Sequence, residues 1–435
     1  MPFAAAELEV LFAQLRQYST IVLAVSGGAD SVALMLLAAR WRARTQPAGR
    51  FIVATVDHGL REQSAAEATW VAEQACAVGF EHIALQWADT KPPTGIQEAA
   101  RVARYRLLAG LAQACLAADE RAAVVTAHTQ DDQAETLLMR LARGSGVDGL
   151  GAMQPVRPAM GGDTACDLVR PLLHVRGARL REVLRSEGLS WLEDPSNDLD
   201  RFERVRIRKA AAQLAEIGLE NEKIALSARR IARAREALDR AVDDLQQQAG
   251  LDLHAGAFAS FKAQPWLMAA EELRLRLVGR LTSAFGGQRS QLSLGSLEAL
   301  VERMSALDFE GATLGGAIIE LVAGEFRVMR EGLRAPLPEL SLTPGGTVMW
   351  DGRFRVRAST AAERSVSVSA LGPAAYSELR HIIDVPRGWP ARAVATLPAI
   401  RSGHELLVVP QLASFPGAPA AWNSAVRLYS AEFAP

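Results

Sequence analysis

The segment SGGADS, residues 26–31, has the residue types and spacing of a site that binds a phosphate or another anion. It joins a short β-branched apolar run at 21–25 to a second apolar run at 32–41, so it connects a buried strand to a buried helix. Glycine lets main-chain N–H groups approach a ligand closely, and the helix start adds unpaired N–H groups and a positive dipole end. These features predict an anion-binding loop made of Ser26, Gly27, Gly28, Ala29, Asp30 and Ser31.

Asp30 is the unexpected member of this loop, because a carboxylate repels a phosphate. The repulsion is relieved if a cation such as Mg²⁺ lies between the two groups, or if the carboxylate caps a backbone amide. A simpler interpretation is a tight strand-to-helix turn with Asp30 or Ser31 as the N-cap. The segment is not a Walker A loop, since it has no Gly-Lys-Ser/Thr, and it lacks the third glycine of the dinucleotide-binding fingerprint.

Three acids follow in the stretch AHTQDDQAETLLMRLARGSG, residues 127–146. Asp131 and Glu135 are four residues apart and share one helix face, with Asp132 beside them. Acids in a first helical turn suit the helix dipole, which is the simpler interpretation. Acids at a ligand-binding edge can also hold Mg²⁺ or an ammonium group. We therefore expect the catalytic carboxylates to be Asp30, Asp131, Asp132 and Glu135.

The first half of the sequence alternates strand-like and helical patterns, which predicts a doubly wound, mostly parallel α/β sheet. The predicted strands are 21–25, 51–56, 82–87, 123–127 and, more weakly, 167–173. The predicted helices are 63–78, 96–117, 129–142 and 178–187. Ligands of such sheets bind beyond the carboxyl ends of the strands. Polar residues follow four of these ends: the 26–31 loop, Asp57 with His58, Asp89, and His128.

The rest of the chain has a different pattern. It is helical from about 204 to 310, with one long amphipathic helix at 227–248, and strand signals return near 317–330. Beyond 340, short β-like runs alternate with Gly and Pro turns. We expect an α/β catalytic domain at 1–212, a mainly helical binding or linker domain at 213–335 and a small mixed, mostly β domain at 340–435.

Composition excludes several classes of protein. The chain has 435 residues, 49% of them hydrophobic, but no apolar run approaches a membrane span and the first residues lack a basic export signal. Three scattered cysteines predict neither a disulfide framework nor a zinc site, so we expect a cytoplasmic protein that contacts no membrane. The net charge is −1, so any basic surface must be local. Arginine supplies nearly all positive charge, which suits phosphate contacts, although a GC-rich genome gives the same bias.

Further strings follow SGGADS in order: VDHGLR (56–61), AARVARYRLL (99–108), HTQDDQAETLLMRLARGSG (128–146), VRPLL (169–173) and WLEDPSNDLDRFERVRIR (191–208). SGGADS resembles the pyrophosphate loop of the PP-loop ATP pyrophosphatases, and the strings together resemble the tRNA(Ile)-lysidine synthetases. The resemblance implies a Rossmann-like fold and a ligase that uses ATP and Mg²⁺. In that family, ATP adenylates the C2 carbonyl oxygen of the wobble cytidine in an isoleucine tRNA with a CAU anticodon. Free L-lysine then displaces AMP to give lysidine, which changes codon reading from AUG to AUA.

The resemblance also implies roles for the candidate residues. The three acids at 131–135 would bind the ammonium group of lysine and accept its proton, because free lysine, with a side-chain pKa near 10.4, is protonated at neutral pH. Contacts with ATP would come from the 26–31 loop, Asp57, Arg104 and His128. Contacts with tRNA or lysine would come from Arg101, Arg140, Arg143, Arg204, Arg206 and Arg208. Arg101, Arg104, Arg140 and Arg143 could equally lie on a solvated helix face, whereas the basic run at 201–209 favours contact with the tRNA backbone. A homodimer is one assembly that the sequence leaves open.

Three rival functions and one departure from the family pattern remain. The amidating synthetases that make GMP, NAD and asparagine share the pyrophosphate loop, but the strings HTQDDQAET and WLEDPSN do not fit them. tRNA thiolation enzymes of the same superfamily need catalytic cysteines, often as a Cys-x-x-Cys pair, and this sequence has no such pair. A non-catalytic sensor of ATP and RNA requires the acids at 131–135 to be helix caps only. Many family members carry a lysine-rich C-terminal stretch, whereas 378–410 here has no lysine. We expect the tRNA contact to pass to Arg380, Arg387, Arg392 and Arg401.

Overall fold

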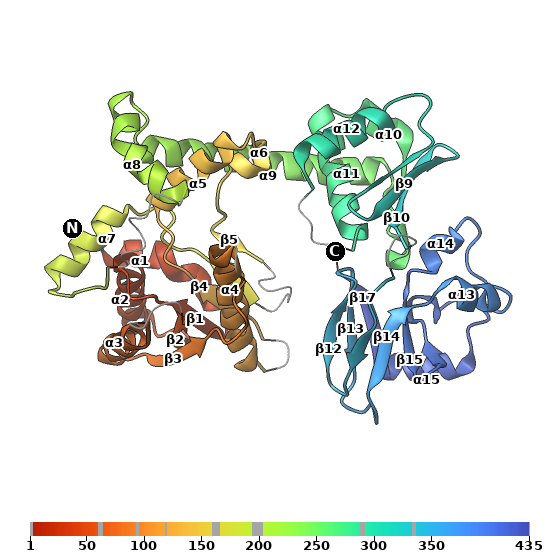
Figure 1. Cartoon of the computed structure of the whole chain (residues 1–435), viewed down its shortest axis with the longest axis horizontal. Helices are drawn as coiled ribbons and strands as arrows, with labels where there is room; N and C mark the ends of the chain where they lie inside the picture. Colours follow the sequence, from red (N-terminus) through yellow and green to blue (C-terminus); the bar gives the residue numbers. More distant parts are fainter. Residues whose placement is uncertain are drawn as a thin grey trace. The chain divides into compact units, whose positions relative to one another are not determined.

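The chain divides into two compact units, residues 1–235 and 236–435, with the boundary inside one long helix. The structure is a computed structural model that describes residues 3–59, 64–92, 95–117, 120–158, 166–193, 203–287, 292–332 and 336–434 (Figure 1). The expected division into three domains stays a prediction, and each of the two units is described by itself.

Unit 1 is built on a six-stranded sheet of order β3-β2-β1-β4-β6-β5. All neighbours are parallel except the edge strand β5, which runs antiparallel to β6. The chain passes from β1 outward to β3 and then returns to the other side of β1, so the winding reverses between β1 and β4. Ligand sites of such sheets lie at this reversal. The strands are β1 Thr20–Ala24, β2 Arg50–Asp57, β3 Glu81–Gln86, β4 Ala122–Val125, β5 Val156–Arg157 and β6 Cys166–Val169.

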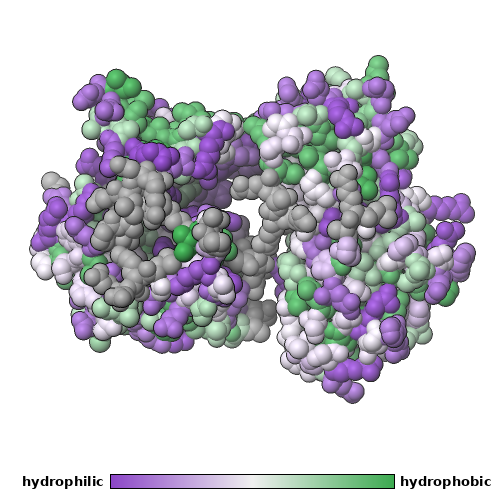
Figure 2. Space-filling view, in the orientation of Figure 1, coloured by the Kyte–Doolittle hydropathy of each residue, from purple (hydrophilic) through white to green (hydrophobic). Residues whose placement is uncertain are grey.

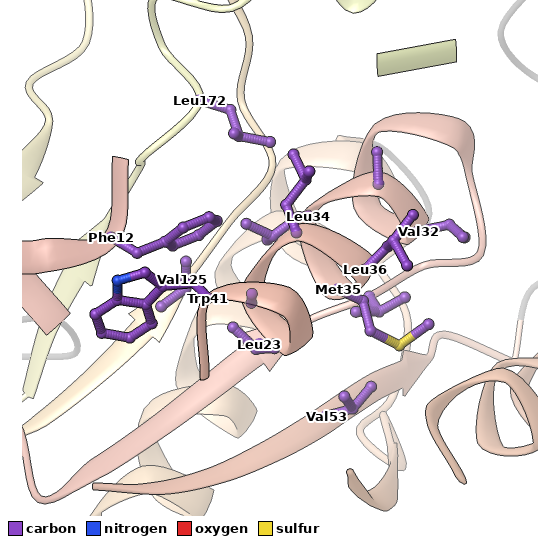
Figure 3. Close-up of a cluster of buried hydrophobic side chains, with 14 of the residues drawn as sticks. Phe12, Leu23, Val32, Leu34, Met35, Leu36, Trp41, Val53, Val125 and Leu172 are labelled. Atoms are coloured by element: carbon purple, nitrogen blue, oxygen red, sulfur yellow. The ribbon is translucent and has the colours of Figure 1, made fainter. Parts of the chain in front are cut away.

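Helices cover both faces of this sheet, which confirms the predicted doubly wound fold. Alternate residues of β1 point to opposite faces, so Leu23 belongs to the core under α2 while Val22 belongs to the core under α4. In Figure 3, Trp41 of α2 lies beside Phe12 and Val125 in the first of these cores. The helices are α1 Ala5–Phe12, α2 Ala29–Thr45, α3 Ser64–Ala77, α4 Ile96–Ala114, α5 Gln130–Ala142, α6 Val147–Leu150, α7 Gly177–Ser186, α8 Glu203–Glu216 and α9 Asn221–Gln248.

Unit 2 contains three antiparallel sheets. Its first half packs α10 Ala263–Met268, α11 Glu271–Phe285 and α12 Leu294–Met304 with a sheet of order β7-β10-β9-β8, which the helical pattern at 204–310 did not fully predict. These strands are β7 Phe258–Lys262, β8 Gly311–Leu314, β9 Ala317–Val322 and β10 Glu325–Arg330. The second half is mostly β, as expected, with sheets β11-β14-β15-β16 and β12-β13-β17. Its elements are β11 Leu340–Leu342, β12 Thr347–Trp350, β13 Phe354–Ala358, β14 Val366–Ala370, α13 Pro373–Leu379, α14 Ala391–Val394, β15 Pro398–Ser402, β16 Glu405–Val408, α15 Ala420–Leu428 and β17 Tyr429–Phe433.

A buried charge cluster joins the two halves of unit 2. Asp351 accepts hydrogen bonds from Nε of Arg330, at 3.0 Å, and from Nε of Arg353, at 2.7 Å. Arg353 is completely buried, and this burial lowers the pKa of its guanidinium to about 10, so it remains charged at neutral pH. Because a buried charge without a partner is very costly, this cluster fixes the end of β10 against the turn between β12 and β13.

The surface mixes hydrophilic and hydrophobic residues over the face seen in Figure 2. Hydrophobic residues show at the tip formed by α8, and Ile217 and Leu219, just beyond that helix, are exposed. Within the described ranges, every helix is too short or too polar to cross a membrane.

A buried network at the amino-terminal edge of the unit 1 sheet should dominate the stability of that edge. The hydroxyl of Tyr18 donates to Oδ2 of Asp167 at 2.7 Å, and Arg121 donates to the same oxygen at 2.6 Å. We expect Asp167→Ala to lower the free energy of unfolding by about 2–4 kcal/mol, because a buried hydroxyl and a cation lose their shared acceptor.

The matched control for this prediction is Glu81→Ala. It removes the exposed pair between Arg50 and Glu81, which meet at 2.8 Å, and should cost under about 1 kcal/mol. Urea denaturation of both variants measures the difference. Equal losses would show that the Asp167 network contributes no more than a surface ion pair.

Candidate active site

A pocket of about 1040 Å³ lies at the carboxyl ends of β1, β2 and β4, where the sheet reverses its winding. It is lined by the loop after β1, the face of α4 and the starts of α2, α5, α7, α8 and α9. The structure brings most of the predicted site residues to this one pocket: Ser26, Gly28, Ala29, Asp30, Ser31, Arg101, Arg104, His128, Asp131, Asp132, Glu135, Arg204 and Arg208.

The glycine loop is held by its own hydrogen bonds. Gly27 has a φ of +88°, which glycine adopts without strain, and its carbonyl oxygen accepts the backbone N–H of Leu192 at 2.9 Å. The hydroxyl of Ser31 donates to the carbonyl of Gly28 at 2.8 Å and lies 3.2 Å from the backbone nitrogen of Ser26. The hydroxyl proton of Ser31 is therefore used to brace the loop.

Asp30 lies at the start of α2 but does not cap it, because the N-cap position belongs to Gly28. Within the described structure, Oδ1 of Asp30 is buried and has no hydrogen-bond partner. Burial, together with the charge of Asp132, raises the pKa of Asp30 to about 6, although Arg181 opposes the shift. A buried carboxylate with a free oxygen is suited to receive a cation.

Asp131 holds three helices together. Its Oδ2 accepts the backbone N–H of Gly177 at 2.9 Å, and its Oδ1 accepts the side-chain amide of Asn221 at 3.0 Å. These two residues begin α7 and α9, so one carboxylate of α5 fixes both helix starts at the pocket. A Cβ on Gly177 would lie 3.2 Å from Oδ2 of Asp131 and 3.4 Å from Oδ1 of Asp30, so the missing side chain makes this close approach possible.

Asp132 and Glu135 occupy different environments on α5. Oδ2 of Asp132 accepts the backbone N–H and the hydroxyl of Thr129, at 2.8 and 2.9 Å, which closes a capping box. Glu135 is buried and accepts Nε of Arg208 at 2.5 Å and Nη2 at 3.4 Å. Burial raises the pKa of Glu135, while Arg208 acts in the opposite direction. The helix-cap interpretation thus describes Asp132 in part and does not describe Glu135.

His128 stays neutral at physiological pH. Its Nδ1 is 2.8 Å from the hydroxyl of Thr126. Burial lowers the pKa of His128 to about 3 in spite of the nearby Asp132, and the positive charges of Arg170 and Arg101 add to the shift. The imidazole can therefore orient a ligand through a hydrogen bond, but it cannot supply a positive charge to a phosphate.

The cations of α4 also face the pocket. Arg104 donates through Nε and Nη2 to Nε2 of His58, at 3.3 and 3.0 Å. Burial lowers the pKa of His58 to about 4, and Arg104 contributes to that shift. His58 is therefore an acceptor that orients Arg104. Arg101 lies over the ring of Tyr105 with 5.2 Å between the guanidinium carbon and the ring centroid.

Some predicted site residues do not line the pocket within the described part of the chain. Oδ1 of Asp57 accepts the backbone N–H of Gly59 at 2.7 Å. Arg140 donates to the carbonyls of Gly149 and Ala152, at 2.7 and 3.0 Å, and so closes the turn after α5. The other predicted residues outside the pocket lining are Gly27, Arg143 and Arg206. Arg143 pairs with Glu203, and Arg206 is exposed on α8.

Sequence reasoning missed Arg176, Arg181 and Asn221, which all line the pocket. A signal for the first two was present, because α7 begins soon after the last parallel strand and its first turn must lie at the same edge of the sheet. Nothing in the sequence places the start of α9 there, since α9 follows another helix, α8, and not a strand of the sheet.

Gly27 and Gly79 allow a matched test of the loop. Both have a positive φ, +88° and +79°, but a Cβ on Gly27 would lie 2.6 Å from Cδ1 of Leu192, while a Cβ on Gly79 meets nothing within 4 Å. Both alanine variants should lose about 1–2 kcal/mol of stability from the left-handed backbone. We expect only Gly27→Ala to distort the loop and weaken the affinity for ATP, the ligand that the resemblance implies, by about tenfold or more.

Calorimetric titration with ATP, alongside urea denaturation, measures both effects. An unchanged ATP affinity in a folded Gly27→Ala protein would contradict the role given to the loop.

Comparison with known proteins places the chain in a family. Residues 3–215 match the PP-loop domain family. A tRNA(Ile)-lysidine synthase from a Bradyrhizobium species is 43% identical over 324 residues, which cover 73% of this chain and 87% of the relative. A tRNA(Ile)-lysidine synthase from Ruegeria pomeroyi is 38% identical over 395 residues, which cover 89% of this chain and 87% of the relative. Among solved structures, a U34-tRNA thiolase from Methanococcus maripaludis has a TM-score of 0.41 and 15% identity over 54% of this chain and 77% of that chain. With such identity to full-length relatives, the chain belongs to the tRNA(Ile)-lysidine synthase family.

Proposed function

We propose that the protein uses ATP to join L-lysine to C2 of the wobble cytidine in an isoleucine tRNA with a CAU anticodon, giving lysidine, AMP and pyrophosphate. One observation carries the proposal. A single pocket holds a glycine loop and helix start suited to an anion, directly beside buried carboxylates suited to a cation. A reaction between a nucleotide phosphate and an amine needs these two environments next to each other.

The anion side of the pocket would hold ATP. The backbone N–H groups at the start of α2 and the positive end of its dipole point into the pocket beside Gly28 and Ala29. Arg104 and Arg101 of α4 lie on the same pocket wall and would contact the phosphates of ATP or the AMP group. Adenylation turns the cytidine carbonyl oxygen, a poor leaving group, into the oxygen of AMP.

Asp30, the acidic residue of the 26–31 loop, is suited to hold Mg²⁺. Among the described residues no cluster of three protein side chains is arranged to hold a metal ion, and Mg²⁺ usually takes only one or two carboxylates together with phosphates and water. The partnerless Oδ1 of Asp30 and the neighbouring Asp132 are the carboxylates that would hold it. Bound there, Mg²⁺ would neutralise phosphate charge and orient the triphosphate.

The cation side would receive lysine. Its ε-amine must arrive as ammonium and lose a proton before it attacks, because its lone pair forms the new bond to C2. The C2–O bond to AMP then breaks, and AMP leaves with the electron pair. Asp132 and Glu135 are the groups that would bind the ammonium, and Glu135, whose pKa is raised by burial, is suited to accept its proton.

The local structure supports some of the candidate arginines as tRNA contacts more than others. The segment from 203 onward is helical, so Arg204 and Arg208 line the pocket while Arg206 does not. Of the C-terminal arginines, Arg392 pairs with Glu320 and Arg401 donates to the carbonyl of Leu371. Arg380 and Arg387 are exposed and are the stronger candidates for phosphate contacts in unit 2.

Two assays in sequence test the function. ATP–pyrophosphate exchange that depends on isoleucine tRNA would establish adenylation, and incorporation of labelled L-lysine into that tRNA would establish ligation. A non-catalytic sensor would bind ATP and RNA without exchange. A cytoplasmic location and a homodimer stay predictions, which fractionation and sedimentation velocity can test.

Asp30→Asn should abolish AMP formation and yet stabilise the unliganded protein. A folded-state pKa near 6 means that ionised Asp30 destabilises the fold above pH 6, and that this cost disappears as the pH falls from 6 toward 4. The variant should therefore be more stable than wild type by about 1–2 kcal/mol at pH 8, with no advantage near pH 4.

Urea denaturation at both pH values, with Asp308→Asn on the exposed surface as control, measures this difference. Normal AMP formation by Asp30→Asn would refute the role of Asp30 in the pocket.

Arg204 and Arg206 provide a test of tRNA contact on one helix. A lost phosphate contact removes counterion release, so Arg204→Ala should flatten the dependence of log K on log salt by about 0.7 for a single-stranded loop. Arg206→Ala should leave the slope unchanged. Filter binding over a salt series gives both slopes, and identical slopes for the two variants would mean that α8 does not meet the tRNA at its pocket face.

A further inference from the structure

Internal donors already occupy most carboxylate oxygens of α5 at the pocket. Asp131 uses both oxygens to hold α7 and α9, and Asp132 uses one on Thr129. Both oxygens of Glu135 accept from the guanidinium of Arg208. The carboxylates proposed to receive the ammonium group of lysine are therefore already covered by a cation of the protein.

Arg208 covers this site from the solvent side. Its Nη2 is 4.0 Å from Oδ1 of Asp132, so the guanidinium lies against both candidate carboxylates. The Arg208 side chain is 46% exposed, whereas those of Glu135 and Asp132 are 6% and 15% exposed. Arg208 is therefore the most accessible of the three groups to an ammonium group in water.

We propose that Arg208 is an internal substitute for the ammonium group of the substrate, which binds Glu135 until lysine displaces it. This inference rests on the proposed use of L-lysine. The physical reason is that a buried carboxylate without a cation is strongly destabilised. Before lysine binds, Glu135 therefore needs a positive charge from the protein itself. Because Arg208 is half exposed, it can move into water at low cost once an ammonium group takes its place.

Because the substrate must displace Arg208 from Glu135, only a substrate with a positively charged side chain should bind. A protonated ε-amine replaces the cation that it removes, so Glu135 keeps a partner throughout. A neutral side chain of the same length would leave Glu135 buried and unpaired, which costs far more than its apolar contacts return. Arg208 would thus select for a long cationic side chain before any chemistry takes place.

The experiment is calorimetric titration of L-lysine into the full-length protein saturated with tRNA and a non-hydrolysable ATP analogue. Arg208→Gln should bind lysine about tenfold more tightly than wild type, because no charged hydrogen bond has to be broken first. Arg206→Gln, on the same helix but outside the pocket, should bind lysine like wild type. Norleucine, which lacks the ammonium group, should not bind to wild type or to Arg206→Gln.

A pH series separates displacement from a merely structural role. Without Arg208, the charged neighbours of Glu135 include the carboxylate of Asp132, which raises the pKa of Glu135, and Arg204, which lowers it. The lysine affinity of Arg208→Gln should therefore fall more steeply than that of wild type as the pH is lowered. If Arg208→Gln fails to fold, Arg208→Lys carries the test, since an ammonium without the planar fork should also be displaced more easily.

The outcomes separate the two proposals. If wild type neither binds lysine nor incorporates it into tRNA, the proposed function fails. If wild type does both, but Arg208→Gln binds lysine equally well or more weakly, the function stands and Arg208 is no substitute for the substrate.

Discussion

The two hydrogen bonds accepted by Asp131 are the constraint on which the pocket depends. One carboxylate of α5 holds the first residue of α7, through the N–H of Gly177, and the first residue of α9, through Asn221. With α2 and α8 also beginning at this edge, five helix starts of the described structure meet there, and each brings N–H groups that have no partner within the helix. Their combined positive potential explains why acids gather at this edge, and why a triphosphate can also be held there.

The pocket keeps opposite charges close together and partly out of water. Burial raises the pKa of Asp30 to about 6 and lowers that of His128 to about 3, so one carboxylate is near its titration point and the imidazole is neutral. Arg208 offsets the charge of Glu135, and Arg181 partly offsets that of Asp30. These opposite charges compensate one another within the pocket. A bound phosphate, metal ion or amine would replace one of the charged side chains in such a pair.

Several residues of types that are common in active sites serve here to position other groups. Ser31 braces the glycine loop, His58 orients Arg104, and Arg140 closes the turn after α5. Such roles are common where a site needs its ligand-binding groups held within a fraction of an ångström. In the proposed reaction, the groups that would meet substrates are chiefly Asp30, Glu135 and the arginines of α4 and α8 that line the pocket.

The sequence by itself determined the parallel sheet, the glycine loop and the edge at which the polar residues meet, because these follow from local periodicity and from the direction of the strands. It also determined the family, through ordered strings such as HTQDDQAET. Only the tertiary structure decided which polar atoms are already bonded. Asp131 and Asp132 are adjacent in sequence, yet one ties two helices and the other closes a capping box. The partner of Glu135 lies 73 residues away on α8, and no local pattern encodes a contact across that distance, because it depends on how the helices pack.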